Sequence, residues 1–175
     1  MTITNTDFAV LQSFQLSVAR LPDVSFFSTS ATLPGVRLNS VDQDSIYKNI
    51  PRAGTKLDLD PFVIDFYVDK NFNNYLSAMN WILALGRTDD ALYQALLASN
   101  PVQATLGEGL VDESDGSLLI YTANNNPALE VIYHGLIPTI LSSPRAVSDV
   151  GDVVYLKSTL SFNYTYFEIK QLGGA

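Results

Sequence analysis

The stretch that decides the fold reads Leu57-Asp58-Leu59-Asp60-Pro61-Phe62-Val63-Ile64-Asp65-Phe66-Tyr67-Val68-Asp69-Lys70-Asn71, then Phe72-Asn73-Asn74-Tyr75-Leu76-Ser77-Ala78-Met79-Asn80-Trp81-Ile82-Leu83-Ala84-Leu85. Its first half is rich in β-branched and aromatic residues, which are typical of a pleated, half-buried surface. Pro61 cannot donate a ladder hydrogen bond, so we expect it at an edge, a bulge or a strand start. In the second half the apolar spacing becomes helical. The stretch therefore predicts a long strand that leads into the main helix.

The main helix is predicted over residues 71–86. Its apolar side chains recur at the i, i+4, i+7 and i+11 spacing that places them on one face, namely Phe72, Leu76, Met79 and Leu83. Asp69 or Asn71 is expected to cap the start of the helix through a side-chain oxygen. Gly86 is expected to end it.

Four side chains of this stretch are the expected structural core, namely Phe66, Met79, Trp81 and Ile82. Met79 and Ile82 are predicted to be buried against the sheet, with Trp81 near its edge. This prediction follows from the orientation of the apolar stripe, since one face of a surface helix packs on the core.

The rest of the chain adds strands and one shorter helix. Strands are predicted over residues 14–21, 26–33, 36–41, 117–123, 128–141 and 153–169, a turn at Pro22-Asp23, a second helix over about 89–99, and a loop or long hairpin tip over 42–55. The expected class is α+β, mainly β: an antiparallel β-sandwich or rolled barrel with one main flanking helix and a short second one. We expect a single domain over residues 1–175, with a loose N-terminal arm over about 1–12.

The predicted strand at 153–169 is longer than the usual 3–10 residues of a globular strand. Its even positions are mostly apolar and its odd positions are polar, for example Leu160 and Phe162 against Ser161 and Asn163. The pattern predicts one amphipathic strand with a single polar face.

Residue types that support catalysis or metal binding are sparse. The sequence has no cysteine, and its one histidine, His134, lies in an apolar strand and is interpreted as a hydrogen-bonded or surface residue. Asp58 and Asp60 share one face of the predicted strand and offer oxygen ligands to a hard cation. A solvated face, or an edge that discourages unwanted pairing, explains them more simply. We therefore predict no enzyme activity, no cofactor and no metal site.

The charge balance restricts the partners. The chain carries a formal net charge of −8, which repels phosphate and argues against sequence-specific nucleic-acid binding. No apolar run approaches the roughly 20 residues of a membrane helix, and residues 1–10 contain no basic side chain of the kind a secretory signal has. We expect a soluble protein with no membrane partner.

Several short motifs, in this order, resemble a known family. They are Ala31-Thr32-Leu33-Pro34-Gly35-Val36, the stretch 57–69 with Asn74-Tyr75 and Met79-Asn80-Trp81-Ile82, Gly135-Leu136-Ile137-Pro138, Ser142-Ser143-Pro144, and residues 156–167. Together they resemble the tail tube and baseplate tube-initiator proteins of contractile-tailed, T4-like bacteriophages. The match around Asp60-Pro61 is closer to the tube-initiators, whereas the chain length suits the tube protein.

The resemblance implies a virion structural protein that forms hexameric rings. Such rings stack into a tail tube for DNA ejection, with tail sheath and baseplate or tail-terminator proteins as partners, DNA as a non-specific passing cargo, and assembly in the host cytoplasm. The channel-facing residues expected on this basis are Asp58, Asp60, Asp65, Thr159, Ser161, Asn163 and Thr165. A tube-initiator ring of the same family is one alternative, and a monomeric ligand- or carbohydrate-binding β-sandwich is an alternative of another class.

Overall fold

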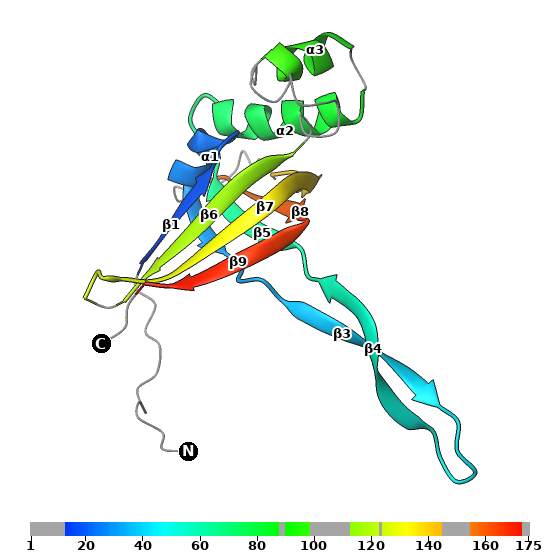
Figure 1. The fold of residues 1–175 in the computed structure, drawn as a ribbon. Helices are drawn as coiled ribbons and strands as arrows, with labels where there is room; N and C mark the ends of the chain where they lie inside the picture. Colours follow the sequence, from blue (N-terminus) through cyan, green and yellow to red (C-terminus); the bar gives the residue numbers. More distant parts are fainter. Residues whose placement is uncertain (1–12, 88–89, 99–112, 123, 145–154, 173–175) are drawn as a thin grey trace, which may run out of the picture.

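The computed structural model describes residues 13–87, 90–98, 113–122, 124–144 and 155–172. Its elements, in chain order, are β1 (Ser13–Val18), α1 (Pro22–Phe26), β2 (Ser28–Ala31), β3 (Val36–Gln43), β4 (Ile50–Leu59), β5 (Phe62–Tyr67), α2 (Asn73–Leu85), α3 (Asp90–Ala98), β6 (Ser114–Tyr121), β7 (Pro127–Leu141), β8 (Lys157–Asn163) and β9 (Tyr166–Gln171). The predicted α+β, mainly β class is confirmed, and so are the main helix and the shorter second helix (Figure 1). The expected N-terminal arm at 1–12 and the start of the last expected strand lie outside the described residues.

Two antiparallel sheets share strand β7. The first, sheet A, contains β1, β6, β7 and β9, and the second, sheet B, contains β2, β5, β8 and the C-terminal part of β7. Residues 129–134 of β7 pair with β9, and residues 137–141 pair with β8. Gly135 lies between the two parts with φ +68°, a conformation that side chains with a Cβ rarely adopt.

The core lies between these sheets. The ring of Phe62 on sheet B stacks on that of Tyr133 on sheet A, with 4.3 Å between the ring centroids. Helix α2 lies across one end of the strands (Figure 1), and its Trp81 packs against Phe162 with the ring centroids 6.0 Å apart. Because both sheets bury one face here, each keeps its other face for solvent or for a partner.

The predicted central strand is broken at Asp60-Pro61. Strand β4 ends at Leu59 and pairs only with β3 among the described strands, whereas β5 begins at Phe62 in sheet B. Pro61 thus lies just before a strand, as expected for a residue without an N–H group. The consequence is a separate β3–β4 hairpin that projects from the body, and residues 50–55, predicted as loop or tip, form part of its second strand (Figure 1).

The predicted strand at 153–169 is also two strands, β8 and β9, which meet at a bend around Thr165. The side-chain alternation reverses there. In β8 the even positions, Leu160 and Phe162, are buried, but in β9 the odd position Phe167 packs against the core and Tyr166 is exposed. The expected single polar face is therefore wrong, because the two strands lie in different sheets.

The predicted turn at Pro22-Asp23 is the start of the short helix α1, and the strand expected at 26–33 is limited to β2.

At the start of α2, neither Asp69 nor Asn71 supplies the cap. The side-chain Oδ1 of buried Asn74 accepts hydrogen bonds from the backbone N–H groups of Asp69 (3.1 Å) and Tyr75 (2.8 Å). Its Nδ2 donates to the carbonyl of Tyr67 (2.8 Å). Asn74 therefore joins the end of β5 to the first turn of α2.

The predicted orientation of α2 needs correction. The buried face consists of Asn74, Ala78, Trp81 and Ala84, whereas Phe72 and Leu76 of the expected stripe are 47% and 46% exposed. Small alanine side chains let the helix approach the sheets closely, so the large Trp81 inserts instead of lying at the edge.

Of the expected core residues, Phe66 and Trp81 are buried, and Ile82 packs against the core from a partly buried position. Met79 is only half-buried and does not belong to the core cluster. Met79 lies off the buried face because the helix packs on the sheets through Ala78, Trp81 and Ala84.

This orientation predicts unequal effects of two truncations. Trp81→Ala removes a large side chain that is 3% exposed and should lower the free energy of unfolding by about 3–5 kcal/mol. The control Leu76→Ala, on the outer face, should change it by about 0.5 kcal/mol or less. Urea unfolding followed by far-UV circular dichroism measures both, and equal losses would show that α2 packs through its other face.

Candidate assembly surfaces

Three of the seven expected channel-facing residues come together on the outward face of sheet B. The backbone register places Asp65 opposite Thr159, and Ser161 lies two residues farther along β8. The carboxylate of Asp65 accepts hydrogen bonds from the hydroxyls of Ser30 and Thr159, both at 2.7 Å. Small polar side chains from three neighbouring strands thus form a polar face with one carboxylate held by two hydrogen bonds.

The ionised form of Asp65 is favoured by its surroundings. The hydrogen bond from Ser30 and then the one from Thr159 lower the pKa of this carboxyl, and the charge of Lys157 lowers it further, although partial burial acts in the opposite direction. Asp65 is therefore ionised at neutral pH, and Lys157 lies on the same outward face of sheet B.

The other four expected residues lie elsewhere. Asp58 is exposed in β4, opposite Arg37 of β3. Asp60 lies at the break before β5, where its Oδ1 is 2.8 Å from Nη2 of the same arginine. Asn163 ends β8, and Thr165 lies at the bend, where its N–H donates to the carbonyl of His134 at 2.9 Å. The first two belong to the base of the hairpin and the last two to the corner between the sheets.

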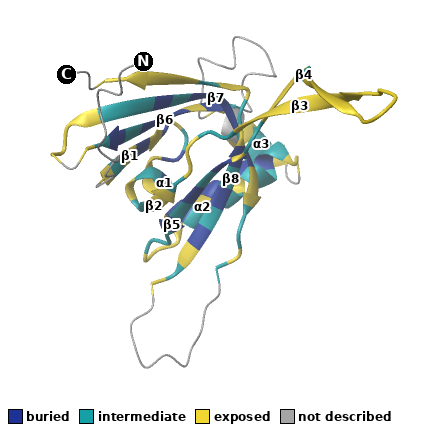
Figure 2. Ribbon diagram, turned by 90° about the horizontal axis from the view of Figure 1, so that it is seen from below, coloured by how far each residue is buried: buried dark blue, intermediate teal, exposed yellow. Residues whose placement is uncertain are grey.

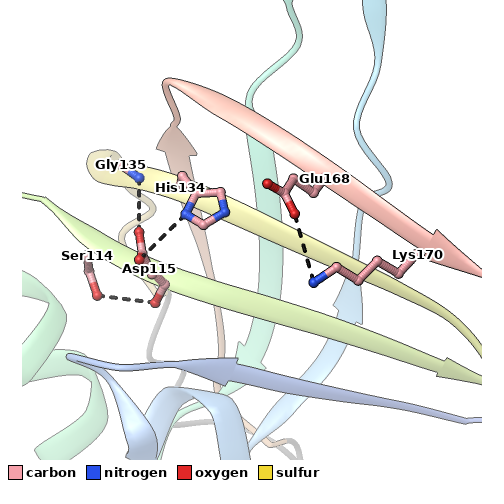
Figure 3. Close-up of polar contacts among 6 residues, drawn as sticks. All are labelled: Ser114, Asp115, His134, Gly135, Glu168 and Lys170. Atoms are coloured by element: carbon pink, nitrogen blue, oxygen red, sulfur yellow. Dashed lines mark hydrogen bonds and ion pairs between the residues drawn. The ribbon is translucent and has the colours of Figure 1, made fainter.

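A second polar face, which the sequence analysis did not identify, covers the outward side of sheet A. It consists of side chains that alternate with core residues on four adjacent strands. The polar and charged ones are Ser13, Gln15, Ser17, Asp115, Ser117, Glu130, His134, Tyr166, Glu168 and Lys170, and Leu119, Tyr121 and Ile132 lie among them. Figure 3 shows Asp115, His134, Glu168 and Lys170 on the three neighbouring strands β6, β7 and β9. The pattern in β1 was visible in the sequence, but that of β9 was obscured by the reversal at Thr165.

The contacts of His134 are structural. Its Nδ1 lies 3.6 Å from Oδ2 of Asp115, and its ring stacks on Tyr166 with 4.4 Å between the centroids. Oδ1 of Asp115 accepts a hydrogen bond from the N–H of Gly135 at 3.3 Å (Figure 3). These contacts join β6, β7 and β9 where β7 passes from one sheet to the other.

Within the described part of the chain, no group of three or more histidine, aspartate or glutamate side chains is arranged to hold a metal ion. No helix in that part is long and apolar enough to cross a membrane. The structure also presents sheet edges, a projecting hairpin and cavities.

Sheet A has two regular outer edges, β1 and β9. Each strand has six residues and pairs with its neighbour without a bulge, and no other described strand pairs with its outer side. Strand β2, at the end of sheet B, has only four residues and a register shift. Short, bulged strands resist pairing with another chain, whereas regular ones offer unpaired N–H and C=O groups.

The space beside β1 is hollow. A cavity of about 410 Å³ is lined by residues of β1, β2 and β6, and a second one of about 510 Å³ by β1, α1 and the start of β2. The hydroxyl of Ser25 in α1 accepts a hydrogen bond from the N–H of Val18 at 3.0 Å. Helix α1 is thus hydrogen-bonded to the last residue of this edge.

Nearly all residues of the β3–β4 hairpin are exposed (Figure 2), and several of them are apolar. Val36, Leu38 and Leu57 are 48%, 57% and 57% exposed near its base, and Ile46 and Tyr47 are both 94% exposed at its tip. A projecting arm buries little of its own surface, so this apolar area indicates a contact with another molecule.

Solved structures share this fold. One is a chain of the anti-feeding prophage baseplate, 6-fold symmetrised, with a TM-score of 0.63, 11% identity, and coverage of 96% of this chain and 99% of that one. A chain of the anti-feeding prophage tube-terminating cap has a TM-score of 0.58, 17% identity, and coverage of 98% and 99%. A chain of the sheath–tube complex of the extracellular contractile injection system PVC, in the extended state, has a TM-score of 0.58, 11% identity, and coverage of 97% and 95%.

No protein-family model matches the sequence, and no curated protein matches it significantly. At such low identities the similarities to solved structures show the fold. It is the fold of chains from the baseplate, cap and sheath–tube complex of contractile injection systems.

The hydrogen bonds of Asp65 predict a pH-dependent contribution to stability. Because the pKa of the carboxyl is lowered from 3.8 in the folded state, its stabilisation is present above that value and is lost as the pH falls through the folded pKa. The difference in Tm between the wild type and Asp65→Asn should be largest above about pH 5 and shrink toward about pH 2. Thr159→Val, which removes one donor, should reduce this pH dependence, and a constant difference across the range would contradict the assignment.

Proposed function

We propose that this protein is a structural subunit of a contractile tail or tail-like injection particle. In this proposal, copies join side by side into a ring, hexameric as in the family that the sequence resembles, and rings stack into a tube. The observation that carries the proposal is the pair of regular, unpaired edges of sheet A, on β1 and β9.

A sheet with two such edges can be extended in both directions. Pairing β9 of one copy with β1 of the next is a head-to-tail contact, and repeating it around an axis closes a ring in which no edge remains. The space of about 510 Å³ that is lined by β1, α1 and the start of β2 leaves room for an incoming strand. Six-fold symmetry is supported by the fold shared with a chain of the 6-fold symmetrised baseplate.

This arrangement assigns the channel wall to the outward face of sheet A. Asp115, Glu130 and Glu168 supply negative charge there, and Lys170 lies 3.9 Å from Glu168. DNA carries one negative charge per roughly 1.7 Å of helix axis, so a wall with an acidic excess does not retain it. DNA then passes as non-specific cargo.

The sequence-predicted residues Asp65, Thr159 and Ser161 lie on the other sheet. In the proposed ring their face is turned away from the axis, toward the sheath.

Baseplate and tail-terminator proteins are the partners at the two ends of the tube. A tube-initiator ring is the alternative within the family, because the similar chains come from the baseplate and the cap as well as the tube. The location is the virion or a tail-like particle, assembled in the host cytoplasm.

Cysteine pairs test the ring directly, because the native chain has no cysteine. Each of Ser13, Gln15 and Ser17 is changed to Cys together with Glu168→Cys, since all four lie on the outward face of sheet A. Oxidation of at least one pair should give a ladder of covalent oligomers that ends at the closed ring. The control pair Ser161→Cys and Glu168→Cys, which places one thiol on sheet B, should not give this ladder.

Light scattering and negative-stain imaging of the wild type complete the test. Rings or tubes support the proposal. A stable monomer of 19.2 kDa at all concentrations, without cross-links, would contradict it and favour a monomeric ligand-binding sandwich.

Lysines on the wall should retain DNA. Tubes of a Glu130→Lys/Glu168→Lys variant are incubated with short DNA duplexes at low salt and then treated with nuclease. The variant should protect more DNA than the wild type, and the protection should fall steeply as salt rises. The matched control Thr159→Lys/Ser161→Lys should bind DNA only where nuclease reaches it. Stronger protection by the control would place the wall on sheet B.

A further inference from the structure

We propose that the tip of the β3–β4 hairpin, Ile46 and Tyr47, seats in the cavity between β1 and β2 of the neighbouring copy. This inference rests on the proposed ring and names a second contact within it. It assigns a specific donor and a specific acceptor to the interface between adjacent subunits.

The donor is the most exposed apolar pair of the described residues. Ile46 and Tyr47 are each 94% exposed, and they follow each other at the end of a hairpin whose strands expose nearly every side chain (Figure 2). Aromatic residues are strongly represented among the few side chains that dominate binding at protein interfaces. A tyrosine at such a tip is therefore suited to act as an anchor.

The acceptor has matching chemistry. The cavity of about 410 Å³ is lined by apolar side chains from three strands and the β2–β3 connection, namely Phe14, Ala31, Leu33, Leu118 and Ile120. Ser13 and Thr29 also line it, so polar atoms accompany the apolar ones. A tyrosine presents an apolar ring with one polar end, which suits a lining of this mixed kind.

The tip cannot fill the cavity of its own chain. The ten residues of β4 extend about 33 Å at roughly 3.3 Å per residue, and the hairpin points away from the body (Figure 1). Its base lies against the corner of β8 and β9, where Leu57, Pro61, Asn163 and Tyr164 line a common surface depression. The cavity lies beside β1, at the opposite edge of sheet A.

Both contacts therefore run in the same direction around the ring. The β9 edge and the hairpin lie on one side of a subunit, and the β1 edge and the cavity lie on the other. In the ring, the first side of one copy contacts the second side of the next copy. A heterologous contact of this kind closes into a ring when its rotation fits the symmetry. The partner that fills the cavity is thus a second copy of this chain.

The test joins donor and acceptor across two chains. A Tyr47→Cys variant is mixed with an Ala31→Cys variant and oxidised under assembly conditions. We expect a disulfide-linked heterodimer. Tyr47→Cys mixed with Thr139→Cys, an exposed position on sheet B, is the matched control and should link much less.

A second variant tests the energetic role. The double substitution Ile46→Ser/Tyr47→Ser should leave the Tm of the dissociated chain unchanged, because both side chains are exposed. It should raise the protein concentration needed for half-maximal ring formation about tenfold or more, as loss of an anchor at an interface does. Filling the acceptor by Ala31→Trp should have a similar effect on assembly, with its fold checked by circular dichroism.

The outcomes separate this inference from the proposed ring. If the cysteine pairs on β1 and β9 give closed rings while Tyr47→Cys does not link to Ala31→Cys and the tip variant assembles like the wild type, the ring stands and the tip contact is overturned. If no pair links and no ring forms, both proposals are overturned.

Discussion

The passage of β7 from one sheet to the other at Gly135 is the constraint on which the rest of the structure depends. Gly135 has a positive φ of 68°, and a Cβ there would lie 2.5 Å from Oγ1 of Thr165. Strands β8 and β9 pair with successive parts of the same edge of β7, so the bend between them has to lie opposite this glycine. The N–H of Thr165 donates to the carbonyl of His134, and the carboxylate of Asp115 accepts from the N–H of Gly135. Three strands are thus fixed at one corner.

This corner decides which side chains reach the two outward faces. Because β8 and β9 lie in different sheets, their outward-facing residues have different numbering. They are the odd positions in β8, on sheet B, and the even positions in β9, on sheet A. The corner also leaves β9 alone on the outer edge of sheet A, opposite β1. The edges on which the proposed ring depends therefore follow from how β7 bends. The break at Pro61 separates β3 and β4 from the two sheets, so that they form the projecting hairpin.

Local patterns predicted the elements more accurately than their relation to one another. The main helix was predicted at 71–86 and observed at Asn73–Leu85, and the second at about 89–99 and observed at Asp90–Ala98, because the helical spacing of apolar residues is a local pattern. The buried face of α2 was mispredicted, since the spacing of Phe72, Leu76 and Met79 records hydrophobicity and not the close approach that Ala78 and Ala84 allow. The grouping of Asp58, Asp60 and Asp65 failed because one proline divides them between a hairpin and a sheet. The alternation of polar and apolar residues did not reveal that the inward-facing positions change from even to odd at Thr165, which lies next to Gly135 of β7.

In the proposed ring, sheet A joins copies of this chain through β1 and β9. Hydrogen exchange of the backbone amides, measured by mass spectrometry on dissociated chains and on assembled particles, gives the decisive test. Edge pairing places the outer amides of a strand in hydrogen bonds, so β1 and β9 should exchange more slowly in the particle while β2 changes little. Equal exchange of β1 and β9 in the two states, or slowing confined to β2 and sheet B, would contradict it.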